Sequence, residues 1–95
     1  MEITISFFGP LRDSVGEKSL TVTLPTDATV ADALERVITE HPDLDAQIYA
    51  DGGEIRGQVV IAKNKLNIAQ LEGVETPLND GDALRLSPPV TGGGV

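Results

Sequence analysis

The sequence has no cysteine and no tryptophan, and only three of its 95 residues are aromatic, Phe7, Phe8 and Tyr49. Without cysteine there are no disulfides, no thiolate metal sites and no cysteine nucleophile. With so few aromatics, the core must consist mainly of Val, Leu, Ile and Ala. Hydrophobic residues still make up 40% of the chain, which predicts a globular domain rather than a disordered one.

Basic residues are also scarce: 7 Lys and Arg oppose 15 Asp and Glu, for a net charge of −8. This balance disfavours binding to nucleic acid or to an anionic membrane, because both attract clusters of Lys and Arg. The single histidine, His41, precedes Pro42 and is expected at the C-terminal end of a helix. Without a second nitrogen ligand, it does not support a catalytic zinc site.

The sequence also lacks a long apolar run and a basic leader followed by an apolar segment. We therefore expect a soluble, cytoplasmic protein with no membrane partner. A chain of 95 residues makes one small domain. We place the folded domain at residues 1–87 and a C-terminal tail at residues 88–95.

Alternating apolar residues predict two strands near the N-terminus, at residues 2–8 and 19–24. Gly9-Pro10 ends the first strand, and residues 11–18 are expected to form a loop or a short turn. The two strands therefore form an antiparallel hairpin. The residues expected on its buried face are Ile3, Ile5, Phe7, Leu20, Val22 and Leu24.

A helix is predicted to follow, with Thr29 as its N-cap and the acidic Asp32 at the third position. Its apolar residues recur with helical spacing and form one stripe, and Pro42 ends it. The stripe is expected to cover the sheet. It consists of Val30, Ala33, Leu34, Val37 and Ile38.

The second half of the chain is expected to be irregular over residues 43–57, apart from one short helical turn. Strands are predicted at residues 58–62, with Val60 in the core, and at 83–86, with a weak edge strand at 66–68. Between them, Lys63-Asn64-Lys65 is expected to form a turn longer than two residues, because a two-residue turn would give Lys65 a positive φ. The order of elements predicts an α+β fold of the β-grasp, or ubiquitin-like, type. A mixed sheet of four to five strands would pack on one main helix, with a flexible C-terminal tail.

The tail reads Pro88-Pro89-Val90-Thr91-Gly92-Gly93-Gly94-Val95. Proline favours an extended path, and glycine lets the backbone of a partner approach closely. Two interpretations stay open: a frayed glycine-rich end, or a carboxylate threaded through a narrow tunnel to a remote reaction centre.

Four motifs in order resemble the MoaD/ThiS family of ubiquitin-like sulfur carriers, and the small subunit of molybdopterin synthase in particular. They are Phe7-Phe8-Gly9-Pro10-Leu11-Arg12, Ala28-Thr29-Val30-Ala31-Asp32-Ala33-Leu34, Thr76-Pro77-Leu78-Asn79-Asp80-Gly81-Asp82 and Pro88-Pro89-Val90-Thr91-Gly92-Gly93. The resemblance covers the whole chain. It implies a carrier whose terminal glycine is adenylated by an E1-like enzyme with ATP and then converted to a thiocarboxylate. Such a carrier is not an enzyme by itself and binds no cofactor or metal of its own; the partner uses the ATP.

The resemblance also assigns roles to residues. Gly93 is the activated glycine, preceded by Gly92, after removal of Gly94 and Val95 by a JAMM-type protease. Pro88, Pro89, Val90 and Thr91 form the part of the tail that binds the partner. Arg12 either forms a salt bridge with the partner or remains an unpaired surface residue. Ser87 stands where the family often has an aromatic residue of the partner interface.

Four functions are compatible with these features. The leading hypothesis is sulfur donation for molybdopterin, the precursor of the molybdenum cofactor, with a MoaE-like large subunit of molybdopterin synthase as partner. The others are a protein modifier joined to lysines by isopeptide bonds, a sulfur carrier for thiamin, tRNA or an amino acid, and a binding domain with an inert tail. Lys63 and Lys65 are expected to be solvated turn residues, with a role as acceptor sites as the alternative.

Overall fold

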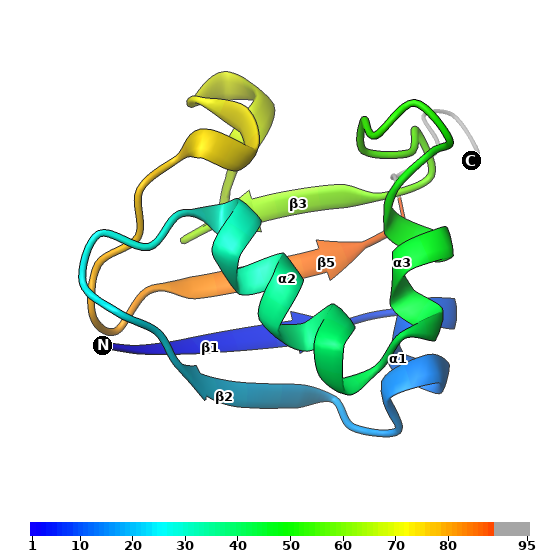
Figure 1. The fold of residues 1–95 in the computed structure, drawn as a ribbon, viewed down its shortest axis with the longest axis horizontal. Helices are drawn as coiled ribbons and strands as arrows, with labels where there is room; N and C mark the ends of the chain where they lie inside the picture. The colour runs from blue at the N-terminus through cyan, green and yellow to red at the C-terminus, as the bar shows by residue number, and fades with distance from the viewer. Residues whose placement is uncertain (89–95) are drawn as a thin grey trace.

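A five-stranded mixed sheet and the helix α2 that lies across one of its faces make up the fold in the computed structural model, which describes residues 1–88 (Figure 1). The strand order is β2-β1-β5-β3-β4. β1 pairs with β5 in parallel, and the other pairs are antiparallel. The strands are β1 (Glu2–Phe7), β2 (Ser19–Thr23), β3 (Val60–Lys63), β4 (Leu66–Asn67) and β5 (Ala83–Ser87). The helices are α1 (Pro10–Val15), α2 (Val30–Glu40) and α3 (Asp43–Ile48), and two 3-10 turns follow β4, at Ile68–Gln70 and Gly73–Glu75. The predicted β-grasp fold is therefore confirmed.

Helix α2 begins and ends where the sequence predicts. Thr29 and Asp32 form a capping box: the Thr29 N–H donates to Asp32 Oδ2 at 2.8 Å, and Asp32 N–H donates to Thr29 Oγ1 at 3.4 Å. This arrangement satisfies backbone donors that the first turn of a helix leaves free. His41 is the C-cap, as expected, and its N–H donates to Val37 O at 2.8 Å.

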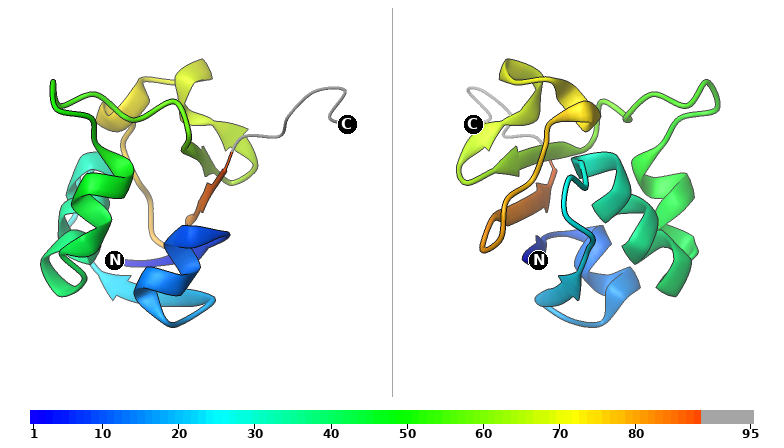
Figure 2. Two further views of the ribbon diagram at one scale, coloured as in Figure 1. Left: turned by 90° about the vertical axis from the view of Figure 1, so that its right-hand side faces the viewer. Right: turned by 60° about the vertical axis from the view of Figure 1, so that its left-hand side comes forward.

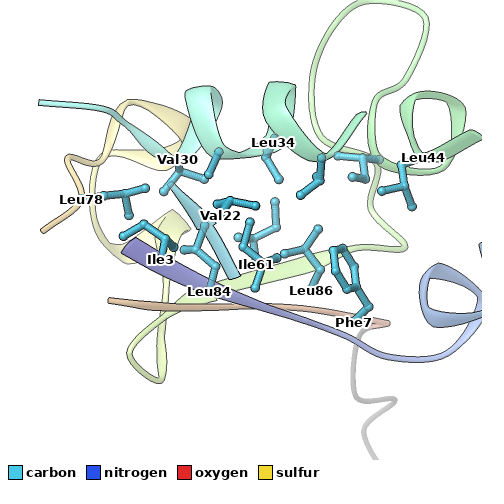
Figure 3. Packing of buried hydrophobic residues seen from close by; sticks show 14 of the residues in the cluster. Ile3, Phe7, Val22, Val30, Leu34, Leu44, Ile61, Leu78, Leu84 and Leu86 are labelled. Atoms are coloured by element: carbon cyan, nitrogen blue, oxygen red, sulfur yellow. The ribbon is translucent and has the colours of Figure 1, made fainter. Parts of the chain in front are cut away.

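The core lies between α2 and the sheet. Figure 3 shows Val30 and Leu34 pointing from α2 toward side chains of the strands, and Leu34 is fully buried. Of the residues expected in the core, Leu20 and Ile38 are half-buried at its edge. The expectation for Val60 is wrong. Its side chain is half-buried and lies outside the hydrophobic core, whereas its neighbour Ile61 is the buried residue of β3. Three apolar residues in a row, 59–61, carry no alternation from which the inward face could be read.

Helix α1 replaces the loop expected after the first strand. Pro10 ends β1 but also occupies the first helical position, where its missing N–H costs nothing. Leu11 and Val15 are buried on one side of the helix, and Gly16 ends it with a left-handed φ of 81°. Pro10 therefore acts as a helix start as well as a strand breaker.

The turn between β3 and β4 has two residues, so the expectation of a longer turn is wrong. Lys63 pairs with Leu66 across Asn64 and Lys65, whose φ values are 49° and 78°. Asn64 tolerates this conformation better than most residues. Its side chain also donates to Asp82 Oδ1 at 2.8 Å and accepts from the Ala83 N–H at 2.9 Å. These bonds to a distant segment hold the tight turn in place.

Candidate functional site

The C-terminal tail leaves the domain from the middle of the sheet, because β5 lies between β1 and β3. Pro88, one of the predicted site residues, follows β5 and is exposed. Figures 1 and 2 show α1, α3 and the end of β5 at the same end of the molecule. The remaining predicted tail residues lie outside the described residues: Pro89, Val90, Thr91, Gly92, Gly93, Gly94 and Val95. The candidate site is therefore the surface around Pro88.

Gly9 makes room for the base of the tail. Its backbone has φ 61° and ψ −141°, a conformation open almost only to glycine. A Cβ atom at this position would lie 3.4 Å from Cδ and Cγ of Pro88. The turn that begins α1 thus passes close beside the start of the tail.

Phe8 lies at the centre of this surface. Its N–H donates to Leu86 O at 3.0 Å, and its side chain is half-buried. The guanidinium carbon of Arg85 is 4.3 Å from the centre of the Phe8 ring, and that of Arg12 is 5.2 Å from it. Both distances are typical of cation–π contacts. One aromatic ring therefore holds two arginines next to the tail.

Arg12 lies against Phe8 and, within the described residues, is bonded rather than paired with nothing. Its Nε donates to Phe7 O at 3.0 Å, and its side chain is half-buried. These contacts with β1 and with Phe8 fix the guanidinium against the Phe8 ring. A contact between Arg12 and a partner stays a prediction.

Arg12 was identifiable from the sequence, whereas Phe8 and Arg85 were missed as site residues. A weak indication is present in the sequence, because Arg85 stands between the inward-facing Leu84 and Leu86 and must therefore face outward. The contact itself depends on the parallel register of β1 and β5, which pairs Ser6 with Arg85 and Phe7 with Leu86. No local pattern reveals a pairing between strands so far apart in the chain.

Two hollows flank Phe8. The tail-base hollow, of about 390 Å³, is bounded by α1, α3 and Pro88. The Arg85 hollow, of about 630 Å³, lies on the face of the sheet opposite α2, here called the open face. Residues of the tail-base hollow include Pro10, Leu11, Gln47, Arg56 and Pro88. Those of the Arg85 hollow include Ser6, Ala62, Asn64, Lys65, Arg85 and Ser87.

One polar atom beside the tail-base hollow lacks a partner. Gln47 donates through Nε2 to Ser14 Oγ, which joins α3 to α1. Its Oε1 is buried and accepts no hydrogen bond from the described residues. An unsatisfied buried acceptor is uncommon in folded proteins.

Asn64, which lines the Arg85 hollow, also belongs to a polar cluster around Asp82. Burial alone would raise the pKa of this carboxyl group. The N–H of Asn79 (2.7 Å), the amide of Asn64 (2.8 Å) and the ammonium of Lys63 (3.5 Å) outweigh that effect and lower the pKa. Asp82 is thus ionised and paired at neutral pH.

Neither a metal-binding cluster nor a membrane-spanning helix is found among the described residues. Within residues 1–88, no three His, Cys, Asp or Glu side chains gather in a way that could hold a metal ion. In the same part of the chain, no helix has the length and apolar character needed to cross a membrane. What the site offers is a tail rooted between two hollows, with arginine and aromatic side chains beside it.

Comparison with known proteins places this geometry in context. A model of the ThiS family matches residues 5–93. The chain is 39% identical over 93 residues to small archaeal modifier protein 3 of Haloferax volcanii, covering 98% of this chain and 100% of that protein.

Solved structures also resemble this chain over nearly its full length. The crystal structure of SAMP1 from Haloferax volcanii superposes with a TM-score of 0.84 at 28% identity, covering 97% of this chain and 99% of that one. A chain in the complex of subunits 1 and 2 of the molybdopterin-converting factor from Helicobacter pylori superposes with a TM-score of 0.61 at 26% identity, covering 97% and 99%.

Proposed function

This chain belongs to the ThiS family of ubiquitin-like proteins, and we propose that it is a carrier activated at its C-terminal carboxylate by an E1-like enzyme. The observation that carries the proposal is the position of the tail. It starts at Pro88, at the end of a central strand, beside the surface formed by Phe8, Arg12 and Arg85. A rigid domain that presents a tail next to a docking surface suits a protein acted on by others.

The proposed activation reaction requires few chemical groups from the carrier itself. A carboxylate oxygen of the terminal residue attacks the α-phosphorus of ATP, and pyrophosphate leaves, which gives an acyl adenylate. Adenylation converts a poor electrophile into an activated acyl group. The activating enzyme binds the ATP and supplies the catalytic groups. The carrier contributes the carboxylate and the surface that positions it.

We propose protein modification as the primary use of the activated tail. The curated relative that matches nearly the full chain carries the name of a modifier protein. In this reaction a lysine amine attacks the activated carbonyl carbon, AMP or the leaving group of a later acyl intermediate departs, the amine nitrogen loses a proton, and an isopeptide bond forms. The proposal places this chemistry in the cytoplasm, with the E1-like enzyme as first partner.

Sulfur donation for molybdopterin is the second candidate. It is favoured by the motif Pro88-Pro89-Val90-Thr91-Gly92-Gly93 and by the superposition on a chain of the molybdopterin-converting factor complex. Here sulfide displaces AMP to give a thiocarboxylate, and the tail would then enter a MoaE-like large subunit. The two uses share the activation step and differ only in the nucleophile.

The two residues after Gly93 must also be accounted for. We infer that a JAMM-type protease removes Gly94 and Val95 and leaves the Gly93 carboxylate for activation. A β-branched valine is a poor substitute for glycine where a partner closes around the backbone.

Two measurements test the proposal and separate its branches. In ATP–pyrophosphate exchange with the E1-like enzyme of the source organism, the processed chain should support exchange; a chain lacking residues 92–95 should not. Intact mass of the protein purified from its own host should then show either isopeptide conjugates or one oxygen replaced by sulfur. Absence of exchange with every form of the tail would contradict activation altogether.

A further inference from the structure

We propose that the Arg85 hollow accepts a carboxylate-bearing side chain of the activating enzyme, with Arg85 and Lys65 as its charged partners and Phe8 as its apolar wall. This inference rests on the proposed function and adds to it the chemistry by which that enzyme recognises the carrier. It concerns a surface of the described domain, not the tail itself.

Charge is distributed unevenly between this hollow and the rest of the chain. The chain carries a net charge of −8, so most of its surface repels an acidic partner. The described residues that line the Arg85 hollow include Lys65 and Arg85 but no Asp or Glu. The closest carboxylate through the hydrogen-bond network, Asp82, is bonded to Asn64 behind the hollow and paired with Lys63. The hollow is therefore a basic site on an acidic protein.

Arg85 is held in place without a salt-bridge partner among the described residues. Its guanidinium carbon lies 4.3 Å from the centre of the Phe8 ring, and its backbone is fixed between Ser6 of β1 and Ala62 of β3. The salt bridges within residues 1–88 join Arg36 to Glu40 and Lys63 to Asp82, and neither includes Arg85. A stacked guanidinium loses less freedom when it binds a carboxylate.

The shape of the site also suits an incoming side chain. Short side chains surround Arg85, and their small size creates the hollow: Ala83 and Ser87 on β5 itself, Ser6 on β1 and Ala62 on β3. Ser87 stands where the resemblance to sulfur carriers places an aromatic residue. In this chain that position is open, so a side chain of the partner can enter and reach Arg85.

The test compares charge reversal inside and outside the hollow. Arg85→Glu is matched with Arg36→Glu, because Arg36 lies on α2 and its bonding partners in the described domain are the exposed Glu40 and the Thr23 carbonyl. Both variants change the net charge equally, and thermal unfolding verifies that both remain folded. The activity measured is ATP–pyrophosphate exchange with the E1-like enzyme, as a function of carrier concentration.

Arg85→Glu should raise the KM for the carrier about tenfold, which corresponds to the loss of one charge-assisted contact, with kcat nearly unchanged. Arg36→Glu should change KM by less than about twofold, because exposed ion pairs contribute little. Arg85→Lys should give an intermediate KM, since lysine keeps the charge but not the planar donor pair. Ser87→Phe should also raise KM by filling the hollow.

A direct readout locates the carboxylate. The Arg85→Lys carrier, bound to its enzyme, is treated with a zero-length carbodiimide. The amine introduced by the substitution, or that of Lys65, should become joined to an Asp or Glu of the enzyme, and mass spectrometry identifies the linked residues. If wild type is activated while Arg85→Glu retains its KM and no such cross-link forms, this inference is wrong and the proposed function stands. If wild type neither binds the enzyme nor supports exchange, the proposed function itself fails.

Discussion

Lys63 Nζ lies 3.5 Å from Asp82 Oδ2 and also donates to Pro77 O at 2.9 Å. The pair joins the end of β3 to the turn that precedes β5. Asn64 and Asn79 complete the set of donors to Asp82, at 2.8 Å and 2.7 Å. These contacts tie together two turns that are far apart in the sequence, and they fix the entry of the central strand into the sheet.

The pKa of Asp82 is lower in the folded protein than its ordinary value of 3.8, so its ionised form stabilises the fold. That stability is fully present above the unfolded pKa and is lost as the pH falls through the folded pKa. Asp82→Asn should therefore cost about 1.5–3 kcal/mol at neutral pH. The difference from wild type should shrink in strongly acidic solution. Urea unfolding at several pH values measures it, and a constant difference would contradict the ionic contribution.

Leu34 is the test of the helix-on-sheet core, because it is fully buried in the middle of α2. Leu34→Ala should lower the free energy of unfolding by about 2–5 kcal/mol. In a small domain that could unfold much of the population. The neighbouring Glu35 is exposed, so Glu35→Ala serves as the control and should change stability by less than about 0.5 kcal/mol. A neutral Leu34→Ala would refute the packing shown in Figure 3.

Lys65 occupies a left-handed conformation with φ 78°, which costs a non-glycine residue roughly 1–2 kcal/mol. Lys65→Gly should raise the free energy of unfolding by about 0.5–1 kcal/mol, since the flexibility of glycine offsets part of the gain. Asn64→Gly relieves a similar conformation but removes the bonds to Asp82 and Ala83, so it should destabilise. Differential scanning calorimetry of both variants distinguishes turn conformation from side-chain bonding.

The length of the tail should control activation without affecting stability. Two residues beyond Gly93 extend the chain by roughly 7 Å, and a displacement of about 1 Å can already cost ~10²-fold in rate. Among variants that end at Gly93, Gly94 and Val95, the Gly93 form should be the best substrate for ATP–pyrophosphate exchange. All three should unfold at the same temperature, because the buried core runs from Ile3 to Leu86. Full activity of the Val95 form with no protease present would refute processing.

The fold was predictable where the sequence alternates or caps clearly. Ile3, Ile5 and Phe7 are separated by single residues, and this alternation identified the buried face of β1. Thr29 and Asp32 identified the start of α2 because both halves of a capping box were present. The prediction failed at residues 59–61, because a continuous apolar run does not show which side chains face the core. It also failed at Pro10, which was predicted only to end a strand but also starts a helix.

The candidate site was predictable only in part. The diproline and the glycines marked the tail, and the resemblance marked Arg12. The contact of Arg85 with Phe8 could not be foreseen, because it joins residues from opposite ends of the chain through the register of β1 and β5. The same holds for Asn64, whose bonds to Asp82 and Ala83 stabilise a turn that local preferences disfavour.

The central place of β5 has a consequence for the order of events during synthesis. β5 follows the other four strands of the described sheet in the sequence, and it completes the sheet because it pairs with both β1 and β3. A chain that stops early leaves two strand edges unpaired, and such edges invite aggregation. The surface formed by Phe8 and Arg85 also comes into being only when β5 has docked. A partner that binds this surface would therefore distinguish molecules in which β5 has docked from those in which it has not.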